Sequence, residues 1–144
     1  MAEAAHPFCK CLFYSANALA RNLTRLAEEA FAQAGLAPSL AFVVLTVGRN
    51  PGIQPSEIAR IMMLSPSTLT RLVEKLEGRG LLRREAKGKA IHIQLTAKGE
   101  ALVPALMAAW QASSQRTAAL LGEEAARRLA DQAYAAAQAL EAEP

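Results

Sequence analysis

The feature that most constrains this chain is a segment near its middle, residues 54–99, in which two short helix patterns precede a hairpin pattern. Ser65-Pro66 opens the second helix, because a serine hydroxyl can cap free backbone N–H groups and a proline at the first position loses no intrahelical bond. Gly80, with Gly78 as the alternative, is placed to end the helix in a left-handed conformation. Both ends of this helix are therefore set by local signals.

The residues of this second helix divide into two faces. Its apolar residues recur at i, i+3, i+4 and i+7, which places them on one buried face: Leu69, Leu72, Val73 and Leu76. The opposite face carries hydroxyl groups and positive charge, from Ser67, Thr68, Arg71 and Lys75. Such a face suits an anionic partner that is rich in hydrogen-bond acceptors.

The hairpin pattern follows directly. Two apolar, partly alternating runs, LLRRE and IHIQLT, flank AKGKA, whose glycine favours a turn. Successive strand residues point to opposite faces, so only one of Arg83 and Arg84 can face the same partner as the helix. We expect the other arginine to hold an acid such as Glu77 or Glu100. Ile53 is expected to add a short pairing strand to this hairpin.

Helix patterns also lie on both sides of this segment. On the N-terminal side, one runs from about Pro7 to Gln33, and a shorter one, capped by Ser39, is expected to be buried nearly all round through Phe42, Val43, Leu45 and Thr46.

On the C-terminal side, Thr96 is expected to cap a long helix. Pro104 then requires either that this helix starts later or that it kinks. The last segment, 122–143, places leucines and alanines on one face.

Charge is uneven along the 144 residues. Residues 39–100 hold ten Lys or Arg against five Glu, a net charge of +5, whereas residues 1–38 sum to zero and residues 101–144 to −2. The excess therefore lies on the segment with the two short helices and the hairpin, as expected for a polyanionic partner. Hydrophobic residues make up 52% and aromatic residues 5%, a composition rich in alanine and leucine that favours helices.

Several classes of function lack their sequence signals. We find no nucleophile elbow, no phosphate-binding glycine loop and no histidine pair at metal spacing on one helix, so we expect no enzyme and no cofactor. His92 is expected to be a half-exposed strand residue without a chemical role. Apolar runs are too short for a membrane span and the first residues lack a secretory pattern, which predicts a cytoplasmic protein.

Three blocks in order, PSEIARIMMLSPSTLTRLVEKLEGRGLLRRE, a basic hairpin tip and IQLTAKGEAL, resemble the MarR family of winged helix-turn-helix transcription regulators. The resemblance implies a mainly α fold with a small β-hairpin wing. It also implies a homodimer on a double-stranded DNA operator, more often as a repressor. Within one structural domain, we expect an N-terminal dimerisation helix at 1–38, a DNA-binding unit at 39–100 and C-terminal dimerisation helices at 101–144.

The resemblance also assigns candidate DNA contacts. In a helix-turn-helix the second helix enters the major groove, so Ser67, Thr68 and Arg71 are candidates for base contact and Lys75 for phosphate contact. The hairpin tip departs from the family pattern of aspartate and arginines, and Lys87 and Lys89 are expected to contact phosphate. The full candidate set is Ser65, Ser67, Thr68, Arg71, Lys75, Arg83, Arg84, Lys87 and Lys89.

The sequence is compatible with three kinds of signal to which such a regulator could respond. Cys9 and Cys11 are similar in position to the redox-sensing cysteine of the OhrR-like branch, although their spacing to Tyr14 differs from that branch. Placed in a helix, the two thiols point about 200° apart, so an intersubunit disulfide is easier than an intrachain one. With His6 they form an alternative soft-metal set. The third signal is a small aromatic ligand between the dimer helices and the DNA-binding unit. A winged-helix protein-interaction module is the alternative function.

Overall fold

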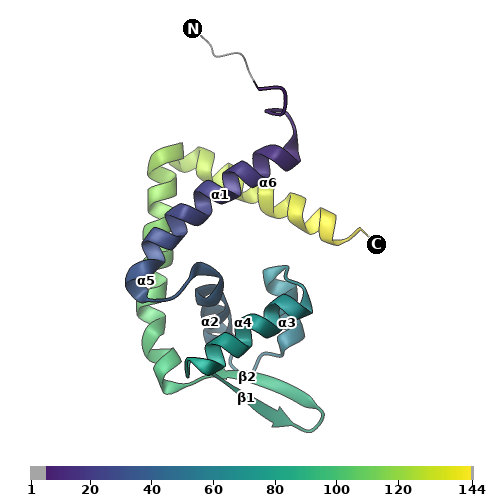
Figure 1. The fold of residues 1–144 in the computed structure, drawn as a ribbon, viewed down its shortest axis with the longest axis vertical. Helices are drawn as coiled ribbons and strands as arrows, with labels where there is room; N and C mark the ends of the chain where they lie inside the picture. The colour runs from purple at the N-terminus through teal and green to yellow at the C-terminus, as the bar shows by residue number, and fades with distance from the viewer. Residues whose placement is uncertain (1–5, 144) are drawn as a thin grey trace.

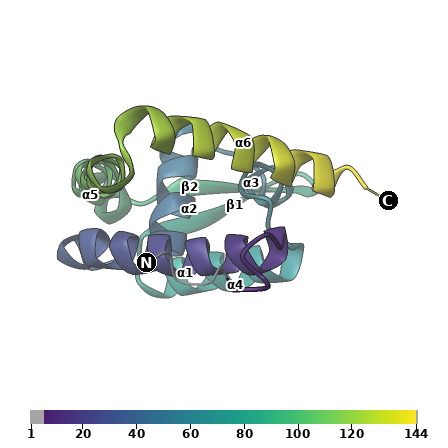
Figure 2. The same cartoon turned by 90° about the horizontal axis from the view of Figure 1, so that it is seen from above.

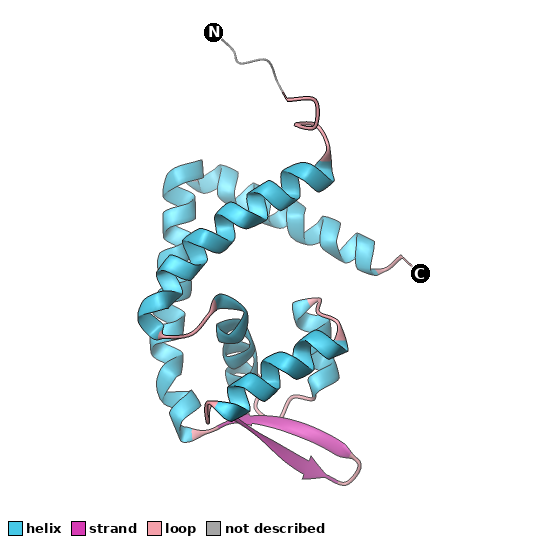
Figure 3. Cartoon of the chain, viewed as in Figure 1, coloured by secondary structure: helices cyan, strands magenta, loops and turns pink. Residues whose placement is uncertain are grey.

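The computed structural model describes residues 6–143. The first five residues and Pro144, which end the predicted dimerisation regions, lie outside this range. Within it the chain forms six α-helices, one short 3-10 helix and one two-stranded antiparallel sheet (Figures 1 and 3). The elements are α1 Leu12–Phe31, η1 Ala32–Ala34, α2 Pro38–Arg49, α3 Pro55–Met62, α4 Pro66–Gly78, β1 Leu82–Lys87, β2 Ala90–Leu95, α5 Ala97–Leu121 and α6 Glu123–Glu141. The predicted mainly α fold with a hairpin wing is confirmed.

The helices form two groups joined by α5 (Figure 1). In the lower group, α2, α3 and α4 stand on the hairpin. In the upper group, α1 and α6 both pack against α5. The view from above shows α5 end-on, with α1 and α6 running away from it along opposite sides (Figure 2). The arrangement leaves α4 and the hairpin at the end of the molecule away from α1 and α6.

The core lies mainly inside the lower group. Its completely buried side chains include those of Val44, Leu69, Leu76, Ile93 and Leu106, which come from α2, α4, β2 and α5. Leu106 belongs to α5, so the long helix shares the core of the lower group. This shared packing fixes the direction in which α5 leaves the lower group.

The long first helix begins later than expected. It starts at Leu12 with Cys11 as its N-cap residue, and the preceding residues form turns in which Cys9 N donates to His6 O and Cys11 N to Phe8 O, both at 2.9 Å. At the other end, the helix tightens into η1 and stops at Gly35, whose φ of +71° is the left-handed conformation that glycine adopts freely. The expected stop is therefore confirmed and the expected start was wrong.

The second helix also differs in detail. Pro38 is its first residue and Ala37 its N-cap, so Ser39 is not the cap. The reason is that proline fits the first helical position, which moves the start two residues earlier. Val43 and Leu45 are buried as expected, but Thr46 is only half-buried and Phe42 is 37% exposed. The Phe42 ring meets Trp110 of α5 edge-on, with the ring centroids 6.3 Å apart.

The start of α5 excludes one of the two alternatives for Pro104. Thr96 Oγ1 accepts a hydrogen bond from Gly99 N at 3.1 Å, and the helix begins at Ala97. The cap is confirmed, and a start after Pro104 is excluded because the proline lies inside the helix.

Exposed apolar side chains concentrate on the upper group. The face of α6 that bears the leucines and alanines is mostly open, with Leu140 66% exposed, and Leu12 of α1 is 73% exposed. Across the whole of α6, Glu123–Glu141, no residue is buried.

None of the helices in residues 6–143 is by itself long and apolar enough to cross a membrane. The segments Leu12–Ala34 and Pro38–Arg49 pass that test only as a pair, bent by 65° at their junction.

Candidate nucleic-acid interface

The start of α4 is built as its sequence predicts. Ser65 Oγ accepts a hydrogen bond from the backbone N–H of Thr68 at 3.2 Å and donates to Thr68 Oγ1 at 2.8 Å. Ser67 Oγ lies 3.3 Å from the same Ser65 oxygen. The three hydroxyl groups therefore form one cluster at the helix start, and part of their hydrogen-bonding capacity holds the helix cap.

The two faces of α4 separate as predicted. Leu69, Val73 and Leu76 are buried, and Leu72 is half-buried beside them. On the opposite side, Ser67, Arg71 and Lys75 are exposed, and Thr68 is half-buried. Arg71 and Lys75 are neighbours on one face, because residues four apart in a helix lie one turn from each other. Neither cation makes an ion pair within residues 6–143, so both are available to an anion.

The turn between α3 and α4 contains a residue with a left-handed backbone conformation that the sequence did not predict. Met63 has a φ of +52°, which side-chain-bearing residues rarely adopt, and Leu64 N then donates to Ala59 O at 2.9 Å. Before it, α3 begins with a capping box in which Gln54 and Glu57 satisfy each other's free backbone groups. In α3, Ile58 and Ile61 have the helical spacing of one core-facing side, but Ile58 is buried and Ile61 is 43% exposed.

The hairpin has the predicted form. Its strands pair antiparallel from Leu82 opposite Leu95 to Lys87 opposite Ala90, which leaves Gly88 and Lys89 as the turn. Gly88 has a φ of +63°, as tight hairpin turns require. Lys87 and Lys89 are exposed at the tip.

One residue outside the hairpin also pairs with the sheet. Ile53 forms an isolated bridge with Ile93, as expected, through Ile93 N and Ile53 O at 2.9 Å. His92 Nδ1 lies 2.6 Å from Gly52 O, so the imidazole holds the loop before α3 and has a structural role.

The two adjacent arginines of β1 face opposite ways, and each meets an acid. Arg84 Nε donates to Glu77 Oε1 of α4 at 2.7 Å, which agrees with the expectation that one arginine holds Glu77. Arg83 pairs with Glu85, two residues along the same strand face, a contact that was not expected. The Arg83 guanidinium lowers the pKa of Glu85 from its ordinary value. An anion that binds Arg83 must therefore replace Glu85.

The cysteines lie at the other end of the molecule. Cys9 and Cys11 are exposed free thiols, and both precede the first residue of α1. The helical geometry expected for them is therefore wrong, because Cys9 lies in a turn and Cys11 is the N-cap residue. Ser15 Oγ donates to Cys9 O at 3.1 Å, which ties this turn to α1.

Three rings from residues near the cysteines in the sequence pack together. His6 stacks on Tyr14 with ring centroids 5.2 Å apart, and Phe8 lies 6.0 Å from Tyr14. His6 Nδ1 also accepts the backbone N–H of Phe8 at 3.2 Å. Between residues 6 and 143, no three His, Cys, Asp or Glu side chains are grouped closely enough to hold a metal ion. The alternative metal set of His6, Cys9 and Cys11 is thus not assembled.

A hollow of about 470 Å³ opens between α1, α2, α5 and α6. Trp110 and Phe42 form its aromatic wall, Ser113 and Thr117 contribute hydroxyl groups, and Arg127 contributes a positive charge. The guanidinium of Arg49 lies 5.4 Å from the Trp110 ring, on the side of α2. The hollow therefore adjoins both the upper helices and the unit that carries α4.

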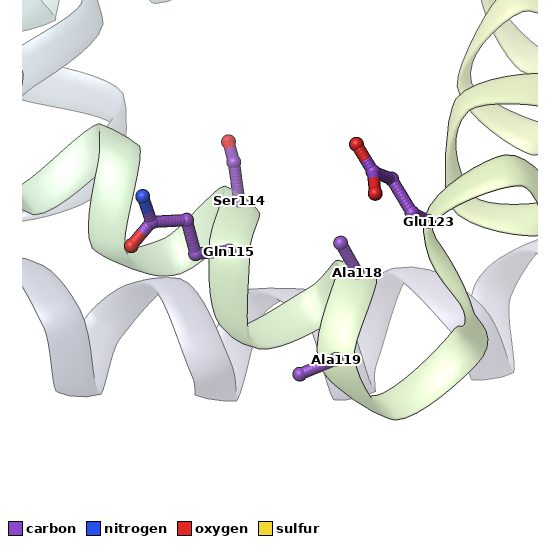
Figure 4. Close-up of a pocket in the computed structure, with 5 residues that line it drawn as sticks. All are labelled: Ser114, Gln115, Ala118, Ala119 and Glu123. Atoms are coloured by element: carbon purple, nitrogen blue, oxygen red, sulfur yellow. The ribbon is translucent and has the colours of Figure 1, made fainter.

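A second hollow, of about 520 Å³, lies at the corner between α5 and α6. Figure 4 shows Ser114, Ala118 and Glu123 directed toward the same open space, with Gln115 and Ala119 on the flank of α5. Three of its five lining side chains, Ser114, Ala118 and Ala119, are small.

Known proteins are similar to this chain in the unit that carries α4 and the hairpin. Residues 36–88, from two residues before α2 to the turn of the hairpin, match the model of the MarR family. The matched unit, 53 of the chain's 144 residues, is of the MarR type. Among its MarR-type relatives, PecS of Dickeya dadantii, an HTH-type transcriptional regulator, is 39% identical over 69 residues, which are 43% of this chain and 42% of that protein.

A second relative is similar over a longer stretch. MdtR of Bacillus subtilis, an HTH-type transcriptional repressor, is 28% identical over 99 residues, which are 67% of this chain and 64% of that protein. The chain thus matches less than two thirds of the length of these curated relatives. Among solved structures, the transcriptional regulator MosR of M. tuberculosis in complex with DNA superposes with a TM-score of 0.82 at 26% identity, covering 92% of this chain and 98% of MosR.

Proposed function

We propose that this chain is a MarR-family transcription regulator that binds double-stranded DNA as a homodimer and represses from a pseudo-palindromic operator. The observation that carries the proposal is the exposed face of α4, with Ser67, Arg71 and Lys75, next to a hairpin whose tip bears Lys87 and Lys89 (Figure 1). A helix of this kind fits the major groove, and lysines at a wing tip fit the phosphates beside it. The similarity to MosR, whose structure includes DNA, supports the same partner.

A homodimer accounts for the apolar surface of the upper helices. Leu12, Leu120 and Leu140 are each at least 66% exposed, and Tyr134 is 57% exposed. Water contact by large apolar side chains costs free energy that a second copy would remove. A two-fold dimer also places two copies of α4 where they can meet half-sites about 34–36 Å apart.

Release from the operator requires a signal that favours one spacing of the two α4 helices over another. We propose a small aromatic ligand in the hollow between α1, α2, α5 and α6, supported by the aromatic wall of Trp110 and Phe42 and the adjacent Arg127. Oxidation of Cys9 or Cys11 is the second proposed signal, supported by the exposure of both thiols near the N-terminus of α1.

The experiment that tests this function is fluorescence-anisotropy titration of the DNA upstream of the protein's own gene, with a scrambled duplex as control, at two salt concentrations. We expect tight binding to the first duplex and a steep loss of affinity with salt, since each phosphate contact contributes about 0.9 to the slope of log affinity against log salt. The alternative, a winged-helix module that binds another protein, predicts no salt-dependent binding to either duplex.

A further inference from the structure

Hydrogen bonds join the residues that follow α4 to the start of α5. Lys98 Nζ donates to the carbonyl of Arg79, the residue that follows α4, at 2.9 Å. Thr96 Oγ1 donates to the carbonyl of Gly80 at 2.5 Å, and Thr96 N to the carbonyl of Leu81 at 3.1 Å. Three consecutive carbonyl groups after α4 are thus held by the first turn of α5.

Gly99 shows how closely the two elements approach. A Cβ atom placed on Gly99 would lie 2.2 Å from the carbonyl oxygen of Leu81, far inside van der Waals contact. The backbones therefore touch with no side chain between them. We conclude that the end of α4 follows any movement of the start of α5.

The side chain of Arg79 connects this junction to a third element. Its Nη2 donates to the carbonyl oxygen of Gly35 at 2.8 Å, across 44 positions of the chain. Gly35 lies in the left-handed turn between η1 and α2, where the direction of the chain changes from α1 to α2. A hydrogen bond from a guanidinium group is charge-assisted and stronger than one between neutral groups.

We propose that Arg79 is a positioning residue that sets the tilt of α4 relative to the corner between α1 and α2. The inference rests on the proposed function, because it concerns how α4 is presented to DNA. Arg79 lies 12 residues after Ser67, so about 18 Å of helix separates them, and a tilt of about 10° moves Ser67 by about 3 Å. That distance is close to the rise of one base pair, about 3.4 Å. In a two-fold dimer, the Arg79 contact therefore determines which half-site spacing fits.

The salt slope and the dependence on half-site spacing distinguish this role from a direct DNA contact. Arg79 is exposed, and a free arginine at this place would serve equally as a phosphate contact. A phosphate contact adds the same affinity on every operator and contributes to the salt slope. A positioning contact instead changes the dependence on half-site spacing and leaves the salt slope unchanged.

The test uses the full chain and three operators: the DNA upstream of its own gene, and the same DNA with one base pair added or removed at the centre. For the wild type we expect each change of spacing to weaken binding by about tenfold or more, and for Arg79→Met by about threefold or less, with equal salt slopes. Arg79→Lys, which keeps the positive charge and a donor but not the planar guanidinium, should fall between them. Lys75→Met is the matched control, expected to weaken all three operators equally.

Two results on these operators contradict the proposal. Equal weakening of all three by Arg79→Met, with a shallower salt slope, would make Arg79 a phosphate contact. Unchanged spacing dependence would show that Arg79 does not position α4. Failure of the wild type to bind any of the DNA would contradict the proposed function instead.

A second measurement decides the role of Arg79 without DNA. Spin labels at Arg21→Cys of α1 and Glu74→Cys of α4, in a chain with Cys9→Ser and Cys11→Ser, report the distance between these helices. Dilution with unlabelled chain restricts the measurement to pairs within one chain. We expect Arg79→Met to broaden the distance distribution, and an unchanged width would overturn the inference.

Discussion

Arg84 and Glu77 form an ion pair that joins the hairpin to the last turn of α4, with Nε 2.7 Å from Oε1. Both side chains are partly exposed, at 40% and 32%, so water weakens their attraction. The pair therefore matters for orientation more than for stability, because it fixes the angle between the two elements proposed to meet DNA.

This pair leads to a first prediction. Glu77→Gln and Arg84→Met should each lower the free energy of unfolding by less than about 1 kcal/mol, the range of exposed ion pairs. The loss of binding free energy on the operator should exceed the loss of unfolding free energy for each variant. A double-mutant cycle in both urea unfolding and DNA titration measures the coupling. Coupling that appears in unfolding but not in DNA binding would contradict the orienting role.

Arg71 provides the second prediction. Its exposed guanidinium lies one turn before Lys75 on the free face of α4. Arg71→Ala should weaken binding to the operator by about 1–3 kcal/mol and relax discrimination at one base position, if the side chain contacts a base. Titration of operators with single base changes measures both effects. Unchanged affinity would remove Arg71 from the interface.

The hairpin tip gives the third prediction. Lys87 and Lys89 are exposed beside the turn at Gly88, and an ammonium group binds phosphate as a point charge. The double variant Lys87→Ala, Lys89→Ala should weaken specific and scrambled DNA alike. It should also reduce the salt slope by about 0.9 for each phosphate that the variant no longer neutralises. A changed sequence preference would instead indicate that the wing reads bases.

Glu29 gives the fourth prediction, on pH. Hydrogen bonds from Arg116 of α5 and Arg25 of α1 lower the pKa of Glu29 from its ordinary value of 4.5. Because the pKa is lower in the folded state, the carboxylate stabilises the fold above pH 4.5, and this contribution is lost as pH falls through the lowered pKa. Thermal melting of wild type and Glu29→Gln should therefore differ at neutral pH and converge in acid.

Glu28 is the matched control for this experiment. It neighbours Glu29 on α1 but makes no ion pair with any residue in the range 6–143. Glu28→Gln should melt like the wild type at both pH values. A difference between wild type and Glu29→Gln that persists in acid would show that the effect does not come from ionisation.

The fifth prediction concerns the thiols. If oxidation is the signal, mild peroxide should release the operator from the wild type and a reductant should restore binding, whereas the variant Cys9→Ser, Cys11→Ser should stay bound. The two thiols precede α1 and are exposed, so both are accessible to the oxidant. Equal release of both proteins would end the thiol hypothesis and leave the ligand hypothesis.

Local signals predicted most of the central unit correctly. Ser65 and Thr96 cap their helices as expected, Gly80 adopts a left-handed φ of +72° after α4, and the hairpin turns at Gly88. Each of these features depends on residues within about four positions of one another. The charge pattern likewise placed a basic face on α4, since helical periodicity alone separates that face from the buried leucines.

Other features depended on competition between neighbouring signals. Pro38 displaced Ser39 from the start of α2, and turns at residues 6–11 shortened α1 so that Cys9 and Cys11 lie outside the helix. The helical spacing of apolar residues can continue past the true end of a helix. Spacing alone therefore does not show at which residue the first turn forms. The same limit explains Ile61, which has the right spacing for the core but no element over it.

The sequence by itself determined which segments become helices and hairpin, where most of them are capped, and which face of α4 is polar, because these depend on contacts between near neighbours in the chain. Only the tertiary structure decided that Arg79 meets Gly35, that Phe42 meets Trp110, and that α5 begins against the backbone of Leu81. Such contacts join residues far apart in the chain. Their geometry follows from how whole helices pack, which no local pattern specifies.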